Sequence, residues 1–162
     1  MKKLFLSLSV LSLMLVSCKS EPKEKTEESV EILFQQEGTL QVYNDTNKVA
    51  QFSIEVADDE FQRENGLMNR DKLGKDQGML FIFQDSAPRR FWMHNTRIPL
   101  DIIYLDKDKK IVNIAKNAQP FDETGVEPSA SDAMYVLEIN AGLSDSLQLE
   151  PGKTRIEFQL TQ

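Results

Sequence analysis

Short segments in which apolar and polar residues alternate run through most of the chain, and this period of two is typical of half-buried β-strands. Alternation over 39–43 and over 50–56, separated by the turn-forming residues 44–47, predicts a first hairpin. A continuous apolar run over 78–83 predicts a buried strand. Further strands are expected over 100–105, 110–115, 134–140 and 156–160.

Signals for helices are fewer. Asp59 lies at the start of an acidic turn and Gln62 follows three positions later, which fits a capping box on a short helix that ends near Gly66. A second short helical or turn element is expected over 141–147. The segment 117–132 carries prolines and no periodicity, so it is expected to be a long surface loop. The sequence therefore predicts an α+β domain, mainly β, with a small antiparallel barrel-like or half-closed sheet and one or two short helices.

Residues 1–17 have the features of an export signal: a short basic start, an apolar run too short to span a bilayer, and small residues directly before Cys18. This arrangement resembles the bacterial lipoprotein signal, in which the cysteine becomes the acylated N-terminus. We therefore expect a lipid anchor at Cys18, a disordered polar tether over 18–30 and a single globular domain over 31–162. The expected location is the bacterial cell envelope, on the periplasmic or surface side of a membrane. The alternative is a buried cysteine in a cytosolic protein.

The formal net charge of the chain is −7 at pH 7. Because an acidic domain repels phosphate backbones, nucleic acid is not an expected partner. Cys18 is the only cysteine, so its acylation would leave the domain without a thiol. Cysteine nucleophiles, disulfides and cysteine-ligated zinc sites are thereby excluded from the predicted domain. The sequence requires no cofactor and does not indicate an oligomeric state.

The stretch 90–106 contains the only tryptophan and the only histidine of the chain. We expect its two halves, 90–95 and 100–105, to pair as an antiparallel hairpin. Because successive side chains of a strand point to opposite faces, one face of this hairpin is expected to pack on the core, and the other is here called the second face. The core face carries Phe91, Met93, Ile102 and Tyr104, and the second face carries Trp92, His94, Asp101 and Ile103.

In this register His94 lies opposite Asp101. An aspartate beside a histidine fixes its tautomer and raises its basicity, as in general-base catalysis and in metal sites where the carboxylate orients a histidine ligand. Asp101 and His94 are therefore the candidate catalytic residues. The alternative is that Asp101 satisfies loop N–H groups and that His94 is a surface residue. No serine or threonine has the sequence context of an activated nucleophile.

Three further patterns have plainer alternatives. Methionines near the histidine are compatible with a Cu(I) site, but core packing explains them better; they are Met68, Met79, Met93 and Met134. Two aspartates over 106–108 resemble part of a calcium loop, but neighbouring lysines favour a plain hairpin turn. Four arginines are a candidate basic patch for a carboxylate or phosphate ligand; they are Arg70, Arg89, Arg90 and Arg97.

Five ordered motifs resemble the domain of unknown function 192 family, and the resemblance covers roughly residues 39–160. They are 65–70 (NGLMNR), 78–83 (GMLFIF), 91–96 (FWMHNT), 98–101 (IPLD) and 136–142 (VLEINAG). The chain departs from the family pattern at Asn65, where arginine is usual, and at His94, where lysine is usual. The resemblance implies a compact β-rich fold in an exported or membrane-tethered setting, and it implies no settled reaction.

Six residues match the family motifs and are the candidate ligand-binding residues: Trp92, Asn95, Thr96, Asp101, Arg70 and Glu138. An aromatic side chain beside amide and carboxylate groups suits a sugar or another small polar ligand. The favoured hypothesis is a lipid-anchored binding module of the cell envelope. The alternatives are an envelope hydrolase that uses Asp101 as general base, with His94 or a metal, and a purely structural or partner-binding envelope protein.

Overall fold

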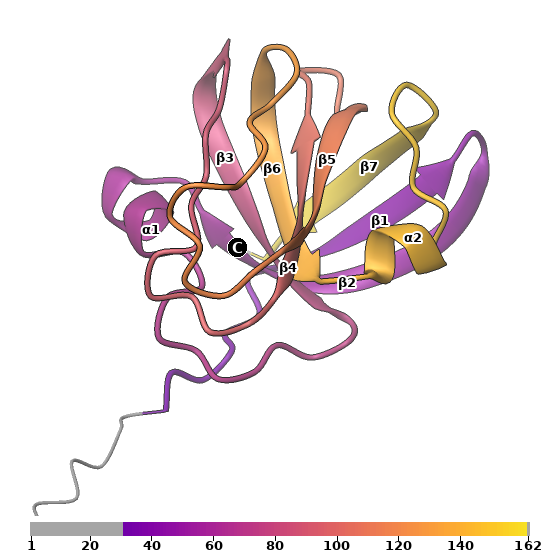
Figure 1. The fold of residues 1–162 in the computed structure, drawn as a ribbon. Coiled ribbons are helices and arrows are strands. Elements are labelled where there is room, and N and C mark those ends of the chain that lie inside the picture. Colours follow the sequence, from indigo (N-terminus) through magenta and orange to yellow (C-terminus); the bar gives the residue numbers. More distant parts are fainter. Residues whose placement is uncertain (1–30, 162) are drawn as a thin grey trace, which may run out of the picture.

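The computed structural model describes residues 31–161 and shows a strongly curved, open seven-stranded sheet with two short helices at its margins (Figure 1). The strands are β1 (Gly38–Asn44), β2 (Asn47–Ala57), β3 (Gln77–Ala87), β4 (Leu100–Leu105), β5 (Ile111–Ala118), β6 (Ala133–Asn140) and β7 (Thr154–Leu160). The helices are α1 (Glu60–Asn65) and α2 (Leu143–Ser146). The predicted mainly β fold with one or two short helices is therefore confirmed. The predicted signal and tether, 1–30, lie outside the described residues.

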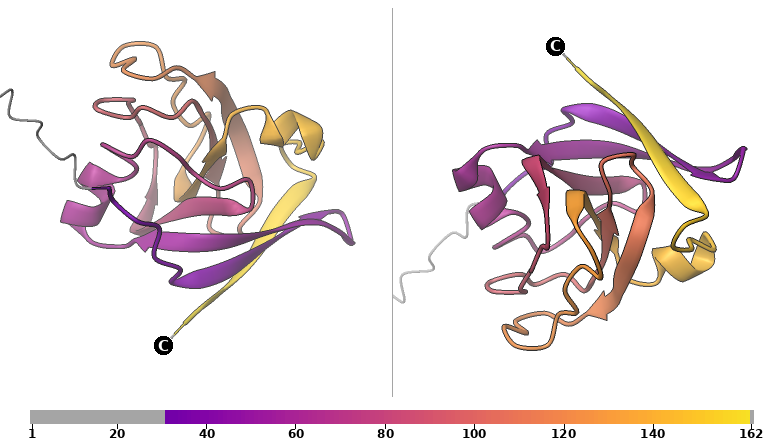
Figure 2. Two further views of the ribbon diagram at one scale, coloured as in Figure 1. Left: turned by 90° about the horizontal axis from the view of Figure 1, so that it is seen from below. Right: turned by 90° about the horizontal axis from the view of Figure 1, so that it is seen from above.

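The strands are ordered β5-β4-β6-β3-β2-β1-β7, and every pair of neighbours is antiparallel except β2 and β3. The parallel β2–β3 pair needs a crossover connection, which α1 and the loop after it supply. The two edge strands approach each other where Lys110 forms an isolated bridge with Arg155. Among residues 31–161, this isolated bridge is the extent to which the curved sheet closes. Figure 2 shows the curved, open sheet from below and from above.

Apolar side chains pack on both faces of the sheet, and each face has its own cluster. On β6, for example, Leu137 belongs to the first cluster and Val136 to the second, because successive residues of a strand point to opposite faces. The second cluster includes Met93 and Ile98, which come from the irregular segment 88–99. This segment therefore covers the face of the sheet toward which Glu138, the next residue after Leu137, also points.

The predicted hairpin between 90–95 and 100–105 is wrong. β4 pairs with β5 along one edge and with β6 along the other, so neither edge is free for a further strand. The segment 88–99 instead has no regular secondary structure, and Asn95 has a φ of 50°. Its backbone bonds to loops: Met93 N donates to Asp122 O at 2.9 Å and Phe121 N donates to Thr96 O at 3.2 Å.

Most local predictions are confirmed. The capping box of α1 is present, since Asp59 accepts from Gln62 N and the Gln62 side chain accepts from Asp59 N. The predicted loop 117–132 is a loop from 119 onward, because β5 continues to Ala118. The turn 106–108 is a plain hairpin turn in which Asp106 Oδ1 accepts from two backbone N–H groups. In residues 31–161, no helix is long and apolar enough to cross a membrane.

The interior strand β6 provides a test of the core. Leu137 on β6 is 0% exposed, and we expect Leu137→Ala to lower the free energy of unfolding by about 2–5 kcal/mol, through lost burial and the cavity left behind. Urea unfolding measures this change. Leu160→Ala on the edge strand β7, where the side chain is 45% exposed, is the control and is expected to change the free energy far less. Equal effects of the two substitutions would contradict this description of the core.

Candidate functional site

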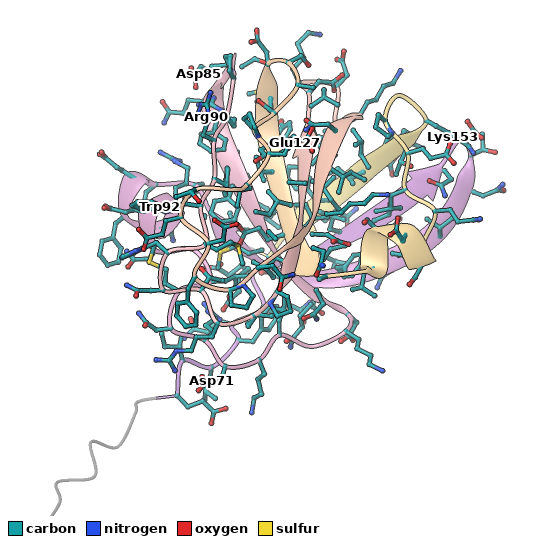
Figure 3. The ribbon with its side chains drawn as sticks, viewed as in Figure 1. Asp71, Asp85, Arg90, Trp92, Glu127 and Lys153 are labelled. Carbon is teal, nitrogen blue, oxygen red and sulfur yellow. The ribbon has the colours of Figure 1, made fainter. Side chains whose placement is uncertain are left out.

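Trp92 lies where two hollows in the surface meet, on the α1 side of the molecule together with Arg90 (Figure 3). The larger hollow, here called the Trp92 pocket, has a volume of about 330 Å³. It is lined by Arg90, Phe91, Trp92, Glu123, Thr124 and Val126. Trp92 is 51% exposed, so one part of a large aromatic side chain is open to a ligand while the rest is anchored.

A chain of contacts fixes the orientation of Trp92. Its indole stacks on the His94 ring, with the ring centroids 5.1 Å apart and the planes inclined by 29°. His94 Nδ1 lies 2.5 Å from Glu123 Oε1, and the Asn95 amide nitrogen lies 3.0 Å from His94 Nε2. Both contacts are satisfied when Nδ1 carries the proton and donates to Glu123 while Nε2 accepts from Asn95. His94 and Asn95 therefore position the indole.

The smaller hollow, here called the Glu138 pocket, shares Phe91 and Trp92 with the Trp92 pocket. Its volume of about 20 Å³ holds about one water molecule. Aromatic walls come from Phe81, Phe91 and Trp92, and Thr96 and Glu138 supply polar atoms. The remaining lining residues belong to α1 and the turn that follows it, over 63–68.

Glu138 is the unusual group of this pocket. It lies on the central strand β6, between Met79 of β3 and Ile102 of β4, and it is only 5% exposed. Within residues 31–161 no hydrogen bond or ion pair reaches its carboxyl group. Burial raises the pKa of the Glu138 carboxyl from 4.5 to about 8, because the charged form loses its hydration. The group is therefore mostly protonated at neutral pH.

Asp101 and His94 do not meet, so the predicted pair is wrong. Asp101 is 1% exposed. Its Oδ1 accepts from Asn117 N at 2.9 Å, and its Oδ2 accepts from Ser144 N at 2.9 Å and from Ser144 Oγ at 2.7 Å. Both oxygens are thus occupied in joining the end of β5 to α2. This corresponds to the alternative interpretation for Asp101, that it satisfies loop N–H groups.

Arg70 also lies apart from Trp92. Its guanidinium forms a buried ion pair with Glu55, with Nη2 2.8 Å from Oε2. Glu55 Oε1 additionally accepts from Gln35 N at 2.7 Å. Of the six predicted ligand-binding residues, the structure brings Trp92, Thr96 and Glu138 to one pocket, with Asn95 attached through His94, and it places Arg70 and Asp101 elsewhere.

The structure also places the methionines and arginines that the sequence analysis considered as a copper site and a basic patch. Met79 and Met93 are core residues, at 5% and 0% exposure, and residues 31–161 contain no cluster of three or more His, Cys, Asp or Glu side chains that could hold a metal. The arginines do not form one patch, because three of the four pair with separate carboxylates: Arg70 pairs with Glu55, Arg89 with Asp85 and Arg97 with Asp71. Arg90 alone of the four lines the Trp92 pocket.

Sequence reasoning missed Glu123 and the two phenylalanine walls. Glu123 lies in the long surface loop predicted over 117–132, and its contact with His94 spans 29 residues. Such a contact has no local signal in the sequence. Phe81 lies in the continuous apolar run of β3, which predicts a buried strand and gives no sign of a pocket. Only the placement of the irregular segment 88–99 against this strand makes it a pocket wall, since Phe81 and Phe91 pack edge to face at 4.9 Å.

The fold and the site define a mainly β domain with an aromatic surface pocket and a buried, unpaired carboxyl group beside it. Residues 41–158 match the model of the DUF192 family, described as "Uncharacterized ACR", and the chain belongs to this family. The family resemblance expected from the five motifs is therefore confirmed.

Two solved structures are similar to this chain. One is a protein of unknown function from Novosphingobium aromaticivorans, with 40% identity, a TM-score of 0.66, and coverage of 74% of this chain and 83% of the other. The second, from Sinorhizobium meliloti, is described as a candidate transcription regulator; it has 35% identity, a TM-score of 0.71, and coverage of 79% of this chain and 97% of the other. No curated protein matches this chain.

The role of Asp101 can be tested by Asp101→Asn. The amide replaces one accepting oxygen by a donor that faces N–H or O–H groups, so we expect a loss of about 3 kcal/mol in the free energy of unfolding, measured by urea denaturation. Asp145→Asn is the control, because Asp145 makes an exposed ion pair with Lys116 and such pairs contribute little. A wild-type stability for Asp101→Asn would show that the three hydrogen bonds are not needed.

The buried Glu138 carboxyl predicts a pH dependence of stability. Its pKa is raised in the folded protein, so its contribution is complete below about 4.5 and is lost as the pH rises through about 8. Between pH 4.5 and pH 9, we expect the free energy of unfolding to fall by on the order of 4 kcal/mol more in the wild type than in Glu138→Gln. Urea unfolding across this range measures it, with Glu123→Gln as the control. Parallel profiles for wild type and Glu138→Gln would contradict the prediction.

Proposed function

We propose that this protein is a lipid-anchored binding protein of the bacterial cell envelope, and that its Trp92 pocket receives a small polar ligand of the size of one sugar ring. The observation that carries the proposal is the half-exposed Trp92 ring, held in one orientation by His94 at the edge of a pocket of about 330 Å³. Rigid aromatic surfaces of this kind supply contact area at low entropic cost.

The polar groups around the ring support a polar ligand. Arg90 and Glu123 line the same pocket and offer a donor and an acceptor at its rim. Ligand pockets of about 300–1,000 Å³ commonly combine an apolar surface with a few such groups. A sugar presents C–H bonds to an aromatic face and hydroxyls to its edges, and this chemistry fits the arrangement.

Other functions have less support. A hydrolase with Asp101 as general base conflicts with the three hydrogen bonds that occupy its carboxylate. The Sinorhizobium meliloti relative is described as a candidate transcription regulator, but a formal charge of −7 opposes binding to DNA phosphates. A purely structural role would make no use of the pocket that the half-exposed Trp92 ring borders.

Trp92 is the only tryptophan, so its fluorescence reports directly on its own pocket. We expect a binding sugar to change this fluorescence in the wild type and to raise the melting temperature. Trp92→Ala is expected to lose the melting-temperature rise while keeping its fold, which circular dichroism checks. Phe121→Ala is the matched control, since Phe121 is 61% exposed and lines neither pocket. An undiminished temperature rise in Trp92→Ala would exclude the Trp92 pocket as the binding site.

A further inference from the structure

Two buried glutamates lie in one row across the sheet. The pairing places Glu55 of β2 beside Met79 of β3, and Met79 beside Glu138 of β6. Neighbouring strands lie roughly 4.8 Å apart, so about two strand spacings separate the two glutamates. Both side chains are close to fully buried, at 4% exposure for Glu55 and 5% for Glu138.

The two glutamates differ in their partners. Glu55 has an ion pair with Arg70 and a hydrogen bond from Gln35 N, so its charge is compensated inside the protein. Glu138 has neither kind of partner among residues 31–161. A buried polar group without a partner lowers stability, and an apolar residue in this row, as at Met79, would avoid that cost. An external partner for Glu138 would explain why this position carries a carboxyl group.

The other polar groups of the Glu138 pocket show what chemistry this partner needs. Three side chains of the lining already donate hydrogen bonds within the protein. Arg63 Nη1 donates to the carbonyls of Asp58 and Ile82, the Asn65 amide donates to Phe61 O at 2.7 Å, and Thr96 Oγ1 donates to His94 O at 3.2 Å. Glu138 has no such partner among residues 31–161, and its carboxylate form can only accept hydrogen bonds. A ligand group rich in donors fits this capacity.

The walls and the size of the Glu138 pocket further restrict which chemical group can bind there. Phe81, Phe91 and Trp92 line it, and aromatic faces attract a cation that has been removed from water. A volume of about 20 Å³ admits one small group of the size of a water molecule. A primary ammonium has that size, three donors and a positive charge.

We propose that the Glu138 pocket binds the primary ammonium group of the ligand while the rest of the ligand lies against Trp92, so that the natural ligand is a small amine, such as an amino sugar or an amino alcohol. This inference rests on the proposed function, because Trp92 is the wall that the two pockets share. It adds the chemical class of the ligand and a residue that selects it.

Binding of an ammonium group is coupled to a proton. In the free protein near pH 7 the Glu138 carboxyl is mostly protonated, and the incoming ammonium favours the carboxylate, so the proton leaves to solvent. The affinity for an amine is therefore expected to rise with pH up to about 8.

The other titratable or charged groups near Glu138 are Tyr104 of β4, which stays neutral because burial raises its pKa, and Arg63 and Glu64 at the pocket mouth. The elements β3 and 88–99 present apolar side chains and Thr96 to this pocket.

The test uses the full chain and two small probes of similar shape, ethylammonium and ethanol, at matched ionic strength. The readout is the pKa of the Glu138 carboxyl, followed by 13C NMR of protein labelled at glutamate carboxyl carbons, with Glu138→Gln used only to assign the signal. We expect ethylammonium to lower this pKa by about one unit or more, and ethanol to leave it unchanged. Glu60→Gln is the control, because it removes an exposed carboxylate of α1 that lines neither pocket, and it is expected to preserve the shift.

The outcomes separate this inference from the proposed function. A pKa lowered by ethylammonium alone supports the ammonium site. No shift, or equal shifts with both probes, overturns it. If uncharged sugars change Trp92 fluorescence while ethylammonium leaves the Glu138 pKa unchanged, the binding function stands and the amine specificity fails. If ethylammonium lowers the pKa while no sugar binds, the ammonium site stands and the sugar class of the proposed function fails.

Discussion

The site depends on β4 and β6 being interior strands of the sheet. Each of these strands has a hydrogen-bonded neighbour on both edges, and each has an apolar cluster on both faces. Side chains along the whole of β4 and over 136–139 of β6 are therefore removed from water whichever way they point. Every polar residue placed there must find a partner within the protein or in a ligand, because burial without one is costly. The two buried acidic residues of these strands, Asp101 and Glu138, meet this requirement in different ways.

Asp101 meets the constraint internally. Its two oxygens accept three hydrogen bonds, and those bonds hold α2 and the end of β5 against β4. A helix of four residues such as α2 has little stability of its own, so the buried carboxylate supplies much of its attachment. Glu138 points to the opposite face, toward Phe81 and the segment 88–99, and no donor among residues 31–161 reaches its carboxyl group. The same architecture thus yields one structural carboxylate and one that is available to a ligand.

The sequence predicted local patterns better than long-range pairing. Phe91 and Met93 were expected to face the core and Trp92 and His94 to face outward, and this alternation is what the structure shows. The partner strand was wrong, because pairing depends on which strand edges remain free, and β6, more than thirty residues away, takes the edge of β4. The His94–Asp101 pair failed for the same reason. The capping box at Asp59 succeeded because both of its residues lie within one turn.

The irregular course of 88–99 also explains why this site is open. In a regular strand paired on both sides, Trp92 would lie over neighbouring strands and pack against their side chains. Here the backbone bonds instead to the loop around Phe121 and Asp122, and Met93 and Ile98 secure the segment in the core at 0% and 5% exposure. Trp92 is consequently supported from one side by His94 and stays half exposed on the other. An anchored loop laid over a central strand therefore allows a rigid aromatic surface and a buried carboxyl group to border the same small pocket, which neither a continuous strand nor a free loop would provide.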